Sequence, residues 1–483
     1  MIDTSRPEGP QPTEKRESHW RDIIIALLAV GVLFFAWMGR PGIEVPLAAG
    51  AGAVLVVLAF SRPAVPCVLF VIFSFLRVHE AFPFMSPWRI PQLLAQLSLV
   101  VIFWHLVLAR SMRPFWTREL MLFAAFFGFV TLGIATSTSW EDSYLQWSDV
   151  FVKVAIIVFV LAWSTRSAGD FQLIARLLTV GGIAVAYVAI YNKYMGIGLV
   201  EGTRVTIGRA DGSVLGDPND LSLALLFPLS FAGALLLGRV NFFDRILGAL
   251  GCTFIFLGIL ATQSRGGLLG LAAVCAILAS RFIKSRSMLI GIGVSAVLLL
   301  FVVAGIGGRS SGGEGQGIDE SSQGRLNAWE TAWNMAVHHP LTGVGLSNFP
   351  ANYWEYTETW DGHAHAVHSS WFLVLAETGF PGLALFLALV GSTALVSWRC
   401  IKIVTTTEVD PRLHTAAYAL AGGLAGFCVS GTFLTQGFTW PFYIIFALTV
   451  ALQKVLTAQQ EQEAFTPQGL APLPRRGLPT GPA

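Results

Sequence analysis

Three histidines lie where a polar segment meets a long apolar one, in the stretch WDGHAHAVHSSWFLVLAETGFPG (360–382). His368 is nearest to the apolar residues, and imidazole is the side chain best suited to accept a proton near neutral pH. Two other interpretations remain, in which His368 only begins a helix or joins His363, His365 and Asp361 in a metal site. The spacing matches neither the HExxH nor the CxxC pattern, so we expect no metal and no cofactor.

Four arginines lie in polar turns that have few acidic residues close in sequence. They are Arg204, Arg209, Arg265 and Arg325. Arg265 precedes two glycines in the turn QSRGG, and Arg325 opens the helical pattern RLNAWETAWNMAVHH, where a cation opposes the helix dipole. Their guanidinium groups could bind a phosphate through two parallel hydrogen bonds. The alternative is that Arg265 extends to the membrane surface from a helix end and that the others are simply solvated.

Two carboxylates accompany these cations. Asp217 precedes Pro218, which is the pattern of a helix N-cap followed by proline at the first helical position. A second interpretation gives Asp217 and Asp220 a role in binding a magnesium diphosphate. Glu377 lies nine residues after His368 within the apolar run, where an ionisable residue is expected to be functional or paired. We therefore treat Asp217 and Glu377, with Arg204 and Arg209, as candidate substrate-binding residues.

The composition requires a membrane. Of the 483 residues, 54% are apolar and 12% are charged, and the mean hydropathy is +0.64. Soluble proteins carry about twice that share of charged residues, so the chain is predicted to be an integral membrane protein. A net charge of +2 gives no indication of nucleic-acid binding. The five cysteines lie in or beside apolar runs, without the spacing of metal ligands or of a disulfide framework.

Long apolar runs predict an all-α, polytopic bundle of about 12–14 membrane-spanning helices, because a span needs about 20 apolar residues. The membrane domain is expected to cover residues 23–455, between disordered tails at 1–22 and 456–483. The candidate spans lie near 23–38, 43–60, 64–78, 91–109, 119–136, 148–163, 173–191, 221–238, 245–262, 266–282, 287–306, 370–396, 414–434 and 438–455.

Lysine and arginine in the short loops predict the orientation. If the N-terminus is cytoplasmic, alternation also places the basic loops near residues 110–118, 239–245, 281–286 and 399–412 inside, with the C-terminus. Loops 137–149 and 435–440 contain no Lys or Arg, and the same alternation places them outside with 192–220 and 263–267. Loop 307–368, the one long loop, also falls outside. We expect a flexible linker over 307–324, then an amphipathic helix at the membrane interface that ends at PLTGVG.

Three blocks of the sequence resemble the signatures of the O-antigen ligase and polymerase superfamily. In order along the chain they are TQSRGGLLGLAA, GRLNAWETAWNMAVHHPLTGVGLSNF and HSSWFLVLAETGFPGLALFL. The resemblance covers about 215–400, with the long outer loop between the first and last blocks. The lead-in WDGHAHAVHSSW is most similar to the branch of O-glycosylation ligases associated with exosortase systems. The N-terminal third resembles the family only in having many spans, and its extra spans leave the handling of the acceptor open.

The resemblance implies transfer of a glycan from undecaprenyl diphosphate to an acceptor hydroxyl at the periplasmic face of the bacterial inner membrane. It implies that Arg265, Arg325 and His368 are the catalytic residues and that neither metal nor cofactor takes part. The acceptor could be the lipid A core of lipopolysaccharide, a protein or another glycan. In this scheme the arginines hold the diphosphate, His368 takes the proton of the acceptor hydroxyl, and the anomeric carbon is inverted.

Two alternatives remain open. A polymerase of the same superfamily would use another lipid-linked repeat unit as its acceptor. A glycan flippase or transporter would carry polar groups along a path between its spans, whereas the polar candidates here gather on one predicted face. Apart from Lys153 and Glu377, the predicted spans are nearly free of charge, which argues against an ion-coupled carrier.

Overall fold

The computed structural model describes residues 44–82, 88–209, 213–283, 318–360 and 362–465, together with isolated positions between 85 and 294. Over these residues the chain is helical, and its only β-type pairing is one isolated bridge between Val200 and Arg204. The predicted all-α class is confirmed. The predicted span near 23–38, most of the span near 287–306, and the tails 1–22 and 466–483 lie outside the described residues.

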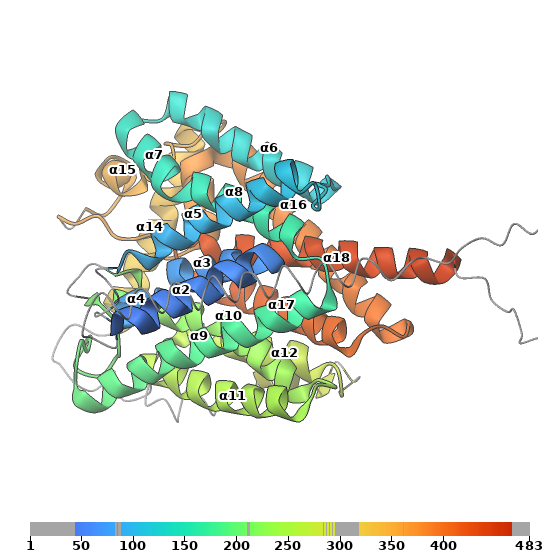
Figure 1. Cartoon of the computed structure of the whole chain (residues 1–483). Coiled ribbons are helices and arrows are strands. Elements are labelled where there is room, and N and C mark those ends of the chain that lie inside the picture. The colour runs from blue at the N-terminus through green and yellow to red at the C-terminus, as the bar shows by residue number, and fades with distance from the viewer. Residues whose placement is uncertain are drawn as a thin grey trace, which may run out of the picture.

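The described helices follow one another with short connections (Figure 1). Their bounds are α2 Glu44–Ser61, α3 Ala64–Phe75, α4 Val78–Ala81, α5 Ile90–Phe103, α6 Arg118–Gly133, α7 Trp140–Gln146, α8 Val152–Ser164, α9 Ala168–Met195, α10 Pro218–Leu237, α11 Phe242–Thr262, α12 Arg265–Ala279, α14 Ile318–His338, α15 Phe349–Tyr356, α16 Ser370–Thr406, α17 Pro411–Ser430 and α18 Trp440–Phe465.

In the described part of the chain, nine helices are long and apolar enough to cross a membrane. Three shorter apolar helices, Gly52–Ser61, Ala64–Phe75 and Arg265–Ala279, fall on three further predicted spans. The span predicted over 64–78 is shorter than expected, since α3 has 12 residues and a crossing needs about 17. The last helix runs on to Phe465, ten residues beyond the predicted boundary at 455.

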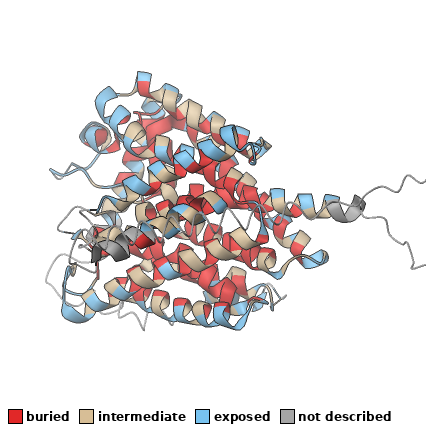
Figure 2. Ribbon diagram, in the orientation of Figure 1, coloured by how far each residue is buried: buried red, intermediate tan, exposed pale blue. Residues whose placement is uncertain are grey.

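The centre of the bundle is formed by α10, α17 and α18, whose side chains are mostly buried (Figure 2). Helix α10 packs against α9, α11, α12 and α17 and carries the proline Pro228 in its interior. Helices α5, α6 and α11 bury one side and expose large apolar residues on the other, as helices that face lipid do. The chain is therefore an integral membrane protein with a packed helical interior.

The predicted outer loop 137–149 is mostly helical, which corrects the loop assignment. Ser139 caps α7 by accepting a hydrogen bond from the amide of Asp142. A π-helical turn at Trp147–Phe151 then joins α7 to α8, so one continuous apolar helix runs over Trp140–Ser164. The polar residues of this stretch had suggested a loop, but they lie on the first turns of the span.

Helix α16 is sharply bent rather than straight. Gly379 has φ 66° and ψ −170°, which is not a helical conformation, and Pro381 follows. The rings of Trp371 and Phe386 lie 5.7 Å apart, although fifteen residues of straight helix would separate their Cα atoms by about 22 Å. The part before Gly379 therefore folds back over the part after it, and the predicted span 370–396 includes both arms of this bend.

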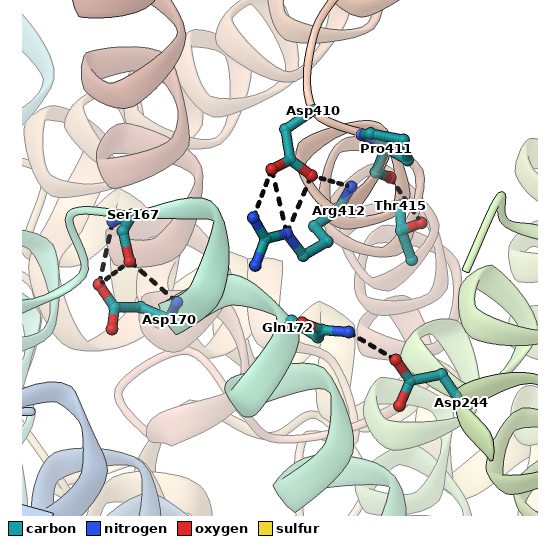
Figure 3. Close-up of polar contacts among 8 residues, drawn as sticks. All are labelled: Ser167, Asp170, Gln172, Asp244, Asp410, Pro411, Arg412 and Thr415. Atoms are coloured by element: carbon teal, nitrogen blue, oxygen red, sulfur yellow. Dashed lines mark hydrogen bonds and ion pairs between the residues drawn. The ribbon is translucent and has the colours of Figure 1, made fainter. Parts of the chain in front are cut away.

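One end of the bundle carries the loops that were predicted to be cytoplasmic, and polar side chains cap its helices (Figure 3). Ser167 and Asp170 form a capping box at the start of α9. The amide of Gln172 donates to Asp244, and Arg412 donates to Asp410 at the start of α17. The contact between Gln172 and Asp244 joins α9 to α11, whose adjoining loops the charge pattern had placed on the same face.

The other end, called here the His368 end, gathers the loops that were predicted to be outside. Helices α4, α14 and α15 lie there, at the left of Figure 1, whereas α18 ends at the right. The Thr138 amide donates to the Val344 carbonyl over 2.9 Å, and Ser143 Oγ donates to the Leu346 carbonyl over 2.8 Å. The segment around 137–143 is thus fixed to the long loop.

Candidate active site

Arg265 occupies the first position of α12, at the His368 end. Gln263 turns the chain with φ 50°, and Ser264 Oγ caps α12 by accepting the Gly267 amide over 3.1 Å. A Cβ on Gly267 would lie 1.7 Å from Ser222 Oγ, so the glycine allows α12 to approach α10. The Arg265 Nε atom is buried without a hydrogen-bond partner among the described residues. The glycines are thus explained by packing, while the guanidinium keeps an unused buried donor.

Arg204 connects loop 192–220 to the Arg265 turn. Its Nη2 donates to Asn219 Oδ1 over 2.8 Å, and Ser264 Oγ donates to the same oxygen over 2.8 Å. Arg204 also forms an ion pair with Glu201, with 3.9 Å between Nη1 and Oε1, and its side chain is 12% exposed. Arg209 folds against its own loop instead, where its Nη1 donates to the Gly216 carbonyl over 3.4 Å.

Asp217 is the N-cap of α10, as its sequence pattern indicated. Its Oδ1 accepts from the amide of Asn219 over 2.7 Å and from the amide of Asp220 over 3.3 Å. Asp217 also lies close enough to Arg325 and His368 to act on both electrostatically, raising the pKa of each. Asp217 therefore combines a structural role with a negative charge facing the candidate catalytic groups.

Arg325 lies inside α14 and not at its start. The helix begins at Ile318, so the part of the predicted linker over 318–324 is helical and the expected conflict with the helix dipole does not arise. Burial lowers the pKa of Arg325, the charge of Arg265 lowers it further, and Asp217 opposes both effects. The two arginines are thus close enough to repel each other, which favours an anion between or beside them.

His368 has a backbone conformation that is rare for a residue with a side chain, with φ 42°. The conformation is held from both sides, since the Val367 carbonyl accepts from Trp329 Nε1 over 2.9 Å and Ser369 Oγ accepts the Phe372 amide over 3.4 Å. Burial lowers the pKa of His368, and the positive charge of Arg325 lowers it further, while Asp217 raises it. The imidazole is therefore kept neutral, which is the form that accepts a proton.

Glu377 lies against the loop that joins α14 to α15. It is 3% exposed, and its Oε1 accepts the amide of Phe349, the first residue of α15, over 3.4 Å. This contact positions α15, so Glu377 has a described structural partner. Among the described residues, no hydrogen bond or ion pair joins Glu377 to the arginines.

The PLTGVG segment fits into the bend of α16. The amides of Val344 and Gly345 donate to the carbonyls of Ala376 and Glu377, over 2.9 Å and 3.2 Å. The Phe380 amide donates to the Pro340 carbonyl over 3.0 Å. A Cβ on Gly343 would lie 2.4 Å from the Ala376 carbonyl oxygen. This interlock fixes the helix of Arg325 against the helix that follows His368.

His363 and His365 lie on the approach to His368. His363 is exposed, and His365 is half-buried with its ring 5.8 Å from that of Tyr353. Among the described residues, no three His, Cys, Asp or Glu side chains are arranged to hold a metal ion. Asp361, which sequence proximity had joined to these histidines, lies outside the described residues.

Gln436 is a site residue that the sequence did not single out. Its Nε2 donates to Asp220 Oδ1 over 2.7 Å, and its backbone amide donates to Ser370 Oγ over 3.1 Å. Ser370 Oγ in turn donates to the Leu434 carbonyl over 2.7 Å. Gln436 thus ties the start of α10 to the start of α16. The only sequence signal is an amide side chain in the short turn TQGFTW between two spans.

The comparison with protein families identifies one family model that matches part of the chain. Residues 250–387 match a family model described as O-antigen ligase. The matched region contains Arg265, Arg325, His368 and Glu377, and it covers less than half of the chain. The resemblance to this superfamily is therefore confirmed. No curated protein matches the chain.

Proposed function

We propose that this protein, which carries an O-antigen ligase domain, transfers a glycan from undecaprenyl diphosphate to an acceptor hydroxyl. The observation that carries the proposal is the convergence of Arg265, Arg325 and His368 from three separate elements. Arg265 and Arg325 act on each other electrostatically, and burial keeps the imidazole of His368 neutral. This arrangement suits a reaction with an anionic leaving group and a hydroxyl nucleophile.

The arginines stabilise the leaving group. As the bond between the anomeric carbon and the diphosphate oxygen breaks, its electron pair remains on the diphosphate, which gains negative charge. The guanidinium groups of Arg265 and Arg325 neutralise that charge through hydrogen bonds, so no proton donor is needed. The buried Nε of Arg265, which has no hydrogen-bond partner among the described residues, is a donor that such an anion would engage.

His368 activates the acceptor. Its neutral imidazole takes the proton of the acceptor hydroxyl while the hydroxyl oxygen forms a bond to the anomeric carbon. Attack from the side opposite to the diphosphate inverts that carbon. The proton then leaves the imidazolium to water, which restores the neutral base. In this scheme Arg204, Arg209 and Asp217 help to bind the substrate. Glu377 contributes through its contact with the first residue of α15.

We infer the cellular location from the lipid-linked donor and from the distribution of lysine and arginine among the loops. We place the His368 end in the periplasm and both termini in the cytoplasm of a bacterium, with the spans in the inner membrane. The partners are then the lipid-linked glycan, a hydroxyl acceptor and the surrounding bilayer, and the product enters the cell envelope. No metal or cofactor is required by this scheme.

A gene deletion tests the function and separates its two forms. Cells that lack the protein should accumulate unattached, full-length polymer if it is a ligase. Accumulation of single repeat units would instead identify a polymerase, the second candidate within the superfamily. Complementation with Arg265→Ala, Arg325→Ala or His368→Ala should fail while the protein level stays normal. Full complementation by all three variants would refute the proposal.

A further inference from the structure

Trp360 is an exposed aromatic residue in the polar segment between α15 and α16. Its side chain is 52% exposed, and its neighbours Glu358 and Thr359 are exposed as well. A tryptophan that anchors a protein at the edge of a bilayer is expected beside lipid, whereas these neighbours require water. An exposed tryptophan in a water-facing segment offers an apolar aromatic face to a ligand.

The segment that carries Trp360 is fixed to the helix of Arg325. Thr359 Oγ1 accepts a hydrogen bond from Asn327 Nδ2 over 2.7 Å, and Asn327 lies two residues after Arg325 on α14. The Thr359 amide also donates to Thr357 Oγ1 over 3.3 Å. The tryptophan therefore keeps its position relative to the candidate catalytic centre.

Ring contacts lead from Trp360 to His368. The centroids of Trp360 and Tyr353 are 6.2 Å apart, and those of Tyr353 and His365 are 5.8 Å apart. His365 is close enough to His368 to lower its pKa. These rings form a chain of contacts from Trp360 to His365, beside the candidate base.

A buried hydroxyl group lies along the same chain of contacts. Tyr353 is fully buried, and its phenol oxygen has no hydrogen-bond partner among the described residues. Buried hydroxyl groups in folded proteins are almost always paired, because an unpaired one loses its bonds to water without replacement. A ligand hydroxyl between the rings of Trp360 and His365 would supply the missing partner.

We propose that Trp360 is a stacking platform for a sugar ring of the acceptor and positions that ring beside His368. The C–H faces of a pyranose are apolar and pack on an aromatic face, while its hydroxyl groups bond at the rim to groups such as Tyr353 and His365. The assignment to the acceptor rests on the proposed function, in which His368 takes the acceptor proton and Arg265 holds the donor. The platform then aligns the acceptor hydroxyl with the base.

Sugar binding is measured without catalysis, by saturation-transfer NMR on the full chain in lipid nanodiscs free of sugar detergents. The probes are methyl glycosides of glucose, galactose and N-acetylglucosamine. We expect transfer to the ring protons of at least one probe with the wild type, and a fall of about tenfold with Trp360→Ala. Trp360→Phe keeps an aromatic face and should retain most of the signal.

A second exposed tryptophan provides the matched control. Trp354 is 64% exposed on α15 and lies outside the ring contacts that join Trp360, Tyr353 and His365, so Trp354→Ala should bind like the wild type. No transfer with the wild type, equal transfer with Trp360→Ala, or an equal loss with Trp354→Ala would each overturn the proposal. Retained transferase activity in His368→Ala would refute the proposed mechanism while leaving the platform intact.

Discussion

At the scale of single residues, the environment of His368 determines which pH dependence its chemistry should show. Burial and the charge of Arg325 lower its pKa from the ordinary value of 6.5. A base works only when it is neutral, and lowering the pH through this pKa adds the proton that blocks it. Activity should therefore persist below pH 6.5 before it falls.

His368→Ala tests this role directly. We expect the turnover rate to fall by a factor of about 10² to 10⁴, the usual contribution of a general base. Binding of the lipid diphosphate should largely survive, because the arginines provide it. A turnover assay with purified protein and a labelled lipid-linked donor measures both quantities over a range of pH.

The neighbouring histidines distinguish a base from a metal site. His363→Ala and His365→Ala should have milder effects on turnover than His368→Ala, and a chelator should leave activity unchanged. If chelation abolished activity, a divalent ion restored it, and all three histidines were equally necessary, His368 would be a metal ligand.

Lysine in place of the arginines tests how the diphosphate is held. Arg265→Lys and Arg325→Lys should each lose most of the activity, because an ammonium group cannot reproduce the planar pair of donors of a guanidinium. The amount of protein in the membrane should stay normal, as judged by immunoblotting. Full activity in both variants would mean that charge alone is sufficient.

Residue types and spacing predicted part of this site. An arginine after a helix end and a histidine before an apolar run were visible in the sequence. The backbone conformation of His368 and the depth of Arg325 within α14 were not, because Ile318 begins that helix inside a stretch of polar residues that is typical of a linker. The contacts of Gln436 with Asp220 and Ser370 join segments more than sixty residues apart and leave no local pattern.

At the scale of the elements, the interlock between PLTGVG and the bend of α16 is the feature that positions the site. Gly343 has φ 64°, and Gly379 has φ 66° with its Cβ position 2.6 Å from the Pro340 carbonyl oxygen. Both glycines allow two backbones to approach more closely than side chains permit. The sequence had suggested only that PLTGVG ends a helix, whereas its amides pair with carbonyl groups of α16 near the bend.

Gly343→Ala should therefore destabilise the protein. The left-handed backbone alone costs about 1–2 kcal/mol for alanine, and the clash with Ala376 adds to it. The added methyl group would force α14 and α16 apart, so activity should fall together with the unfolding temperature. Thermal unfolding of the purified protein measures the change.

Gly391→Ala is the control for this substitution. Gly391 lies in the helical part of α16, and its added Cβ would meet nothing within 4 Å, so its unfolding temperature should stay the same or rise. If the two alanine variants unfolded at the same temperature, the interlock would not contribute to stability.

At the scale of the whole molecule, the two ends of the bundle carry different loops. The loops that lack lysine and arginine meet at the His368 end, and basic loops such as those at Arg166 and Arg412 meet at the other end. The lysine and arginine content of these loops and the contacts between the loops therefore group them at the same two ends.

Site-directed labelling should place these ends on opposite sides of the membrane. Single cysteines at Ser137 and Glu320, in a cysteine-free variant, should react with an impermeant maleimide from outside the cell membrane. Cysteines at Lys284 and at both termini should react only after the membrane is permeabilised. Reaction of the Glu320 position only from inside would eliminate a periplasmic mechanism.

Most of the architecture followed from the sequence, because the bilayer requires long apolar runs for its spans. The exceptions have physical causes. The π-helical turn at Trp147–Phe151 continues a helix through polar residues, and α3 is an apolar run that ends too early to cross. The bend at Gly379 divides one apolar run into two arms, which hydropathy cannot detect.

The positive φ of His368 implies a conflict between the stability of this protein and its chemistry. A residue with a side chain is strained in the left-handed region. The backbone conformation that presents the imidazole therefore lowers the stability of the fold. His368→Gly and His368→Ala both lack the base, but glycine relieves the strain and should leave the protein about 1 kcal/mol more stable than alanine does. Chemical denaturation of the two variants measures this difference. Without selection for transfer, replacement of this histidine by glycine would be favoured by stability, because only glycine relieves the backbone strain.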